Sequence, residues 1–182
     1  GSSMNIEWST PSVAGATLKV AYSPKNDATF VNDKSVSGSV STHKQGGYDV
    51  ILDFSPEMLD GLNVFAGRSV IEQALNVGAG SSGDRTQYVY GATYAMGGFT
   101  IGYQESRDNL QNDTIGAVNS YYSNQAFGVS FNVNDNLSLS YGSHKSKNSL
   151  NSGASVELEA ESLQMAYTMG GMSIKIAESS VD

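Results

Sequence analysis

Apolar and polar residues alternate along most of this chain with a period of two. In residues 88–96 every second residue is apolar or aromatic, and the residues between them are small or polar, with Val89 as the exception. The same alternation recurs in residues 17–22, 48–54, 99–104, 127–133, 137–142, 163–169 and 172–177. Such alternation predicts β-strands that have one apolar face and one polar face.

One strand-turn-strand phrase occurs twice. The segment YAMGGFTIGYQES (residues 94–106) returns as YTMGGMSIKIAES (residues 167–179), and seven of the thirteen positions are identical. Two glycines separate the strands in each copy, and glycine tolerates the positive φ that a tight hairpin needs. A chain that repeats one hairpin is expected to build a large antiparallel sheet.

The connections between the expected strands fall into two length classes that alternate. The shorter ones occupy residues 12–15, 96–98, 134–136 and 169–171, and the turn at residues 55–61 is somewhat longer. The longer ones, rich in Asn, Ser, Gly and Asp, occupy residues 24–46, 74–85, 108–120 and 147–155. We therefore expect an all-β fold, an antiparallel up-and-down meander of about ten strands with short turns at one end and long loops at the other.

Composition narrows the class of protein. The 182 residues are enough for one domain, taken as residues 4–182, because residues 1–3 look like an expression remnant. The net charge of −8 argues against a nucleic-acid partner, and the absence of cysteine excludes disulfides and thiolate metal sites. No apolar run reaches the roughly 18 residues of a membrane helix, but alternating transmembrane strands never produce one.

The two predicted faces differ in a way that favours a membrane barrel. The polar face consists mostly of Gly, Ala, Ser, Thr, Asn and Gln, which suit the wall of a water-filled lumen. The other face is rich in Tyr, Phe, Leu, Ile and Met, with aromatics near the strand ends, as in the girdles of barrels that contact lipid. Alternation alone also fits a soluble β-sandwich, such as a surface adhesin that binds glycans through its loops.

The ordered series of hairpins resembles the Gram-negative general porins, in particular those of marine alphaproteobacteria. The resemblance rests on residues 8–23, 61–67, 88–106, 127–146 and 167–179. It implies a barrel of about 16 strands in the outer membrane, usually a trimer, through which small hydrophilic solutes and ions diffuse passively. Porins are about twice this length and end in a strand with a terminal aromatic residue, so we expect this chain to be part of a longer barrel.

Seven side chains with the parity of the polar face are the candidate pore-lining residues. They are Glu7, Lys19, Asp49, Asp53, Gln87, Gln104 and Lys175. Fixed charges in a pore favour ions of one sign, so these residues would set a weak selectivity. Arg68 falls on the apolar parity instead. The alternating residues Glu157, Glu159 and Glu161 fit either an acidic pore mouth or a solvated strand end.

No combination of residues indicates an enzyme. The two histidines, His43 and His144, lie in or beside expected loops, where a solvated histidine is the commoner case. No serine has the context of a nucleophile elbow, and the paired glycines precede no helix that would bind phosphate. We therefore expect no catalytic residues, no metal and no cofactor. The expected partners are the lipid bilayer, small hydrophilic solutes and further copies of the chain.

Overall fold

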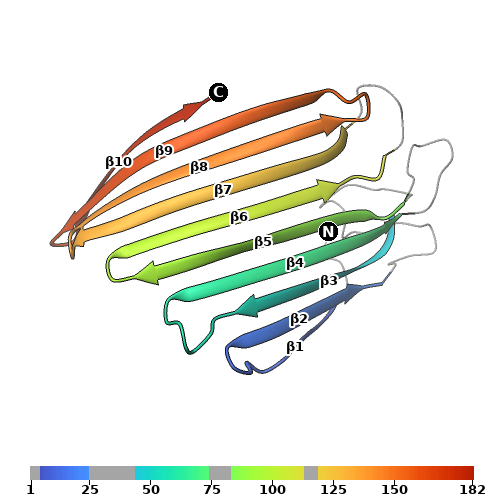
Figure 1. Ribbon diagram of the computed structural model, residues 1–182, viewed down its shortest axis with the longest axis horizontal. Helices are drawn as coiled ribbons and strands as arrows, with labels where there is room; N and C mark the ends of the chain where they lie inside the picture. The colour runs from blue at the N-terminus through green and yellow to red at the C-terminus, as the bar shows by residue number, and fades with distance from the viewer. Residues whose placement is uncertain (1–4, 25–43, 74–82, 113–118) are drawn as a thin grey trace.

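The computed structural model describes residues 5–24, 44–73, 83–112 and 119–182, which form one antiparallel sheet (Figure 1). Its strands are β1 (Ile6–Ser9), β2 (Ala16–Ser23), β3 (Lys44–Phe54), β4 (Leu62–Gln73), β5 (Arg85–Met96), β6 (Phe99–Asn109), β7 (Asn119–Asn134), β8 (Leu137–Leu150), β9 (Ser155–Met169) and β10 (Met172–Val181). Each strand pairs with its neighbours in sequence, in the order β1 to β10. The predicted all-β meander of ten strands is confirmed.

The tight hairpins lie together at one end of the sheet, which we call the turn end, and the opposite end is the loop end (Figure 1). The two copies of the repeated phrase are the hairpins β5–β6 and β9–β10. Their turn glycines Gly97, Gly170 and Gly171 have φ values of 59°, 55° and 84°. These left-handed conformations explain why glycine occupies both turns.

One expected loop is much shorter than the sequence suggested. Strand β8 continues to Leu150 and β9 starts at Ser155. The prediction of a long connection over residues 147–155 is therefore wrong. Lys147 lies opposite Glu157 in the ladder, and its Nζ is 3.0 Å from a Glu157 carboxylate oxygen. This cross-strand pair, with Gly153 at φ 85°, lets the hairpin close over four residues.

The described residues form a single layer, so the two packed sheets of a β-sandwich are absent from them. Only two hydrophobic side chains among them are buried, Val70 and Ile71, each 4% exposed. None of the described residues belongs to a helix long and apolar enough to cross a membrane. Stability therefore comes mainly from the strand ladder and from what the faces contact, rather than from an enclosed core.

The ladder register places most of the large apolar side chains on one face, which we call the outer face. Exposed members of this outer face include Leu52, Val64, Ile101, Tyr103, Phe127, Leu163 and Ile174. The apolar band crosses the ladder rows obliquely: one row begins with Trp8, Val20 and Val50 and ends with Lys147 and Glu157. An oblique band is expected when strands are tilted from the membrane normal, as they are in barrels.

The sheet is open. Strands β1 and β10 are its two edges and do not pair with each other. All ten residues of β10 are exposed. Unpaired backbone groups are costly in lipid, so each edge needs a pairing partner in a bilayer.

Candidate functional site: the polar face of the sheet

All seven predicted pore-lining residues lie on one face of the sheet, opposite the outer face. Glu7, Asp49 and Gln87 belong to a single ladder row that runs through Ala21 and Ser69. Lys19 lies in the adjacent row, opposite Ser9 and Ile51. The register thus brings the charges of β1, β2 and β3 together near the loop end. That these side chains line a pore stays a prediction.

The remaining predicted residues lie farther towards the turn end. Asp53 and Gln104 share a row that includes Phe65 and Gly91. Asp53 is held in place, because its Oδ1 accepts a hydrogen bond of 3.0 Å from Asn63 Nδ2. Lys175 lies opposite Ala166, three residues beyond the start of β10, and is separated from the other six.

The polar face is also the hollowed one. A depression of about 350 Å³ lies against β3 to β7, with Ile51, Gly67 and Val89 as an apolar floor and Asp49 and Gln87 beside them. A second hollow, of about 560 Å³, lies against β1 to β3 and is lined by Glu7, Lys19 and Asp49. Most of the residues that line the two hollows belong to the polar face, so we interpret this face as the concave side of the curved sheet. Arg68, Tyr88 and Arg107 also line the first hollow, although their parity is that of the outer face.

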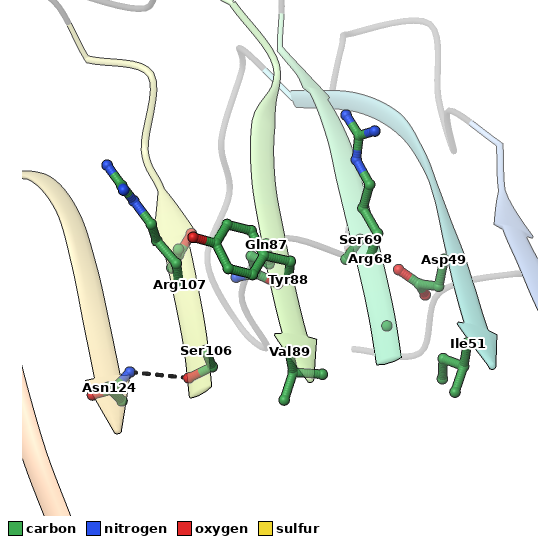
Figure 2. A pocket seen from close by; sticks show the side chains of 12 residues that line it. Asp49, Ile51, Arg68, Ser69, Gln87, Tyr88, Val89, Ser106, Arg107 and Asn124 are labelled. Carbon is green, nitrogen blue, oxygen red and sulfur yellow. Dashed lines mark hydrogen bonds between the residues drawn. The ribbon is translucent and has the colours of Figure 1, made fainter. Parts of the chain in front are cut away.

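Neutral hydrogen-bonding groups cross the hollow from strand to strand. Asn124 Nδ2 donates to Ser106 Oγ at 3.3 Å, the contact drawn in Figure 2. Ser146 Oγ donates to Asn124 Oδ1 at 2.8 Å, so the chain of contacts spans β6, β7 and β8. These cross-strand bonds fix the amide and the hydroxyls on the polar face of the sheet.

An ion pair at the loop end was missed by the sequence reasoning. The alternation pattern places Arg85 and Asp108 in loops, but they lie in β5 and β6 on the polar face. Arg85 Nε donates to Asp108 Oδ1 at 2.8 Å, and a terminal nitrogen of the same guanidinium also contacts the carboxylate. Arg85 has the same parity as Gln87, which was the available signal in the sequence.

The acidic residues of β9 face outwards rather than into a pore mouth. Glu157 lies opposite Lys147, and Glu159 opposite Lys145, on the outer face that continues down to Leu163. Lys145 Nζ is 3.2 Å from Glu157 and 2.6 Å from Glu159. The acidic-mouth alternative is therefore wrong, and these carboxylates form a charged margin above the apolar band.

Possible metal ligands are scattered over the part of the chain that the structure describes. Within it, no three acidic, histidine or cysteine residues gather closely enough to hold a metal ion. His144 lies in β8, opposite Ala126 and Ala160, and is exposed. His43 lies outside the described residues.

Comparison with known proteins was informative at the level of structure alone. No family model and no curated protein matches the sequence. OmpF of Salmonella typhi, in a complex with daunomycin, matches with a TM-score of 0.66 at 14% identity, over 91% of this chain and 49% of OmpF. OmpT, an outer membrane protein of Vibrio cholerae, matches with a TM-score of 0.63 at 16% identity, over 98% of this chain and 53% of OmpT. Outer-membrane expressed OmpT gives a TM-score of 0.66.

The chain spans about half the length of the solved structures that it matches. At these identities the likeness shows the fold, which is that of outer-membrane β-barrel proteins, as the sequence predicted. The predicted outer-membrane localisation agrees with the neighbours that are described as outer membrane proteins. The narrower resemblance to general porins of marine alphaproteobacteria stays a prediction.

Proposed function

We propose that this chain forms part of the wall of an outer-membrane pore through which small hydrophilic solutes and ions diffuse passively. The observation that carries the proposal is the two-faced single sheet. Its outer face presents exposed apolar side chains such as Ile101, and its concave face presents polar side chains such as Thr100 and Gln104. A sheet that is apolar outside and polar inside separates lipid from water.

The side chains of the polar face support weak rather than strong selectivity. Carboxylates at Glu7, Asp49 and Asp53 are interspersed with ammonium groups at Lys19 and Lys175. Charges of both signs partly cancel, and hydroxyls and amides fill much of the wall between them. Small neutral and charged solutes are therefore the substrates we propose, and the wall carries out no chemistry on them. We further propose that copies of the chain associate, as trimers or otherwise.

The orientation of the two faces can be tested with cysteines, because the chain contains none. Thr100→Cys and Ile101→Cys place a thiol on opposite faces of β6 at adjacent positions. In reconstituted vesicles we expect the cysteine at position 100 to react with a water-soluble maleimide and the one at position 101 to react only with a lipid-soluble reagent. The reverse pattern would show that the apolar face points inwards.

Channel activity is tested in a planar bilayer. We expect discrete conductance steps that are blocked when the thiol introduced at position 100 is labelled with a bulky reagent. Labelling of the cysteine at position 101 with a lipid-soluble reagent of similar bulk serves as the matched control and should leave the conductance unchanged. A well-folded, membrane-inserted sample that gives no steps would contradict the proposed pore.

A further inference from the structure

Arg68 is a charged residue set into the apolar outer face. It lies opposite Val50 on β3 and Tyr88 on β5, with Ala66 and Val70 two residues away on its own strand. The side chain is exposed, and no described residue forms a hydrogen bond or ion pair with it. A cation in an apolar membrane-facing surface is costly unless it reaches a polar partner.

Arg107 lies in the same ladder row, on the far side of Tyr88. Its Nε donates to Asn109 Oδ1 at 2.9 Å, and its guanidinium carbon lies 3.8 Å from the centroid of the Tyr121 ring. These contacts fix the guanidinium in place and leave its terminal nitrogens for another acceptor. Such positioning lowers the entropy that a ligand must overcome on binding.

The carboxylate two residues before Arg107 on the outer face of β6, that of Glu105, already accepts hydrogen bonds. Glu105 accepts hydrogen bonds from the hydroxyls of Tyr90 and Tyr103, and from Gln125 Nε2 at 3.2 Å. No carboxylate among the described residues forms an ion pair with Arg68 or Arg107. The two guanidinium groups therefore carry positive charge that the described part of the sheet does not neutralise.

We propose that Arg68 and Arg107, with Tyr88 between them, bind the phosphate group of a lipid headgroup at the loop-end margin of the apolar band. Neighbouring strands are about 4.8 Å apart, so the two arginine backbones are separated by about 10 Å. Figure 2 shows both side chains extending towards the loop end on either side of the Tyr88 ring. The Arg107 guanidinium is held against Tyr121 on β7, so Arg68, which no described residue holds, is the side chain that bends towards the other for both to reach one headgroup.

The chemistry of the surroundings identifies the ligand as a lipid. The guanidinium fork matches the oxygens of a phosphate and binds them in bidentate fashion. On the turn side of the arginines, Leu52 and Tyr90 are 46% and 45% exposed and offer an apolar surface for acyl chains. The site thus combines a cationic margin with an apolar surface below it. The proposal rests on the proposed function in one respect, that the outer face contacts lipid.

Lipid binding can be measured without channel activity. The protein is folded in phosphatidylcholine nanodiscs, phosphatidic acid is added as the phosphate probe, and the retained lipid is counted by native mass spectrometry. We expect the variant Arg68→Gln/Arg107→Gln to bind phosphatidic acid at least about tenfold more weakly than the unmodified protein. Unchanged binding by this variant would overturn the proposal.

Two further variants make the result specific. Lys19→Gln/Lys175→Gln removes the same amount of charge from the polar face and should bind phosphatidic acid as the unmodified protein does. An equal loss of binding in this variant would show a nonspecific charge effect and overturn the site.

Arg68→Lys/Arg107→Lys keeps the positive charge but removes the guanidinium fork, and we expect intermediate binding. This variant also tests the site if the glutamine variant fails to fold, and in that case binding at full strength would contradict it.

The remaining outcomes separate other ligands from a lipid. Inorganic phosphate that bound the two arginines as tightly as phosphatidic acid would identify a free anion and overturn the lipid assignment. A glutamine variant that lost an oligomer but retained lipid would identify a second copy of the chain as the occupant and overturn the lipid assignment. If the protein conducts but does not bind phosphatidic acid, the lipid site is wrong and the proposed pore is unaffected. If it binds phosphatidic acid but does not conduct, the proposed pore is wrong and the lipid site is unaffected.

Discussion

The ring of Phe65 lies against the backbone of Gly91, opposite it across β4 and β5 on the polar face. A Cβ atom at position 91 would lie 2.7 Å from a Phe65 ring carbon and 2.5 Å from the carbonyl oxygen of Tyr103. We therefore expect Gly91→Ala to lower the free energy of unfolding by about 1–3 kcal/mol, because either the ring or the strand must move. Urea unfolding of the protein folded in detergent, followed by intrinsic fluorescence, measures this change.

A glycine with space above it provides the control for that substitution. A Cβ at Gly128 would meet nothing closer than the Tyr141 carbonyl oxygen, at 3.7 Å, which is an ordinary contact. Gly128→Ala should change the free energy of unfolding by no more than about 0.5 kcal/mol. Similar losses in the two variants would show that the contact with Phe65 is not the cause.

A lysine on the outer face should be far more damaging than one on the polar face of the same strand. Ile101 lies between Tyr94 and Val129 in the ladder, whereas Thr100 lies between Ala95 and Ser130. We expect Ile101→Lys to lower the stability of the protein in lipid bilayers by about 2–4 kcal/mol, and Thr100→Lys to have little effect. Denaturant titration in lipid vesicles gives both values, and equal costs would contradict the assignment of the faces.

Removal of a carboxylate from the polar face should change ion selectivity. Asp49 lies in the row of Glu7 and Gln87, beside both hollows described above. In Asp49→Asn we expect the reversal potential across a salt gradient to shift towards anion preference, since one fixed negative charge is lost. Glu159→Gln makes the same change in charge on the outer face and should leave the reversal potential where it was.

The Arg85–Asp108 pair should show coupling in a double-mutant cycle. Each side chain is 21% exposed, so removal of one partner leaves the other largely sheltered from water. We expect Arg85→Met alone to cost about 1–3 kcal/mol of unfolding free energy. Arg85→Met/Asp108→Leu should cost less than the sum of the two single changes. Strict additivity would mean that the ion pair contributes nothing of its own.

The sequence predicted the fold well because strand alternation is a local signal. The parity of Tyr88 and Tyr90 assigned the faces of β5 without knowledge of any partner strand, and the paired glycines located its turn. The exception, Val89, has a reason visible only in three dimensions. It lies opposite Gly67 on the polar face, and its Cγ1 would be 3.3 Å from a Cβ at that glycine. A larger side chain there fills the space that the glycine leaves.

Contacts between side chains on different strands could not be inferred from the sequence, and this limited the prediction of the site. Arg85 and Asp108 were assigned to loops because polar, glycine-containing stretches precede and follow them, and only the ladder shows that they meet. The three glutamates of β9 have the right spacing for a shared face, but alternation alone does not tell which face that is. Their position opposite Lys145 and Lys147 decides it.

Because each strand pairs only with strands that are adjacent in sequence, a hairpin can be duplicated during evolution as one unit. Each strand contacts only the strands before and after it, so the insertion of two strands lengthens the sheet without disturbing any existing register. The similarity of β5–β6 to β9–β10 is the trace expected from such a duplication. Barrels built in this way change circumference in steps of two strands, which is the even count that bacterial outer-membrane barrels show.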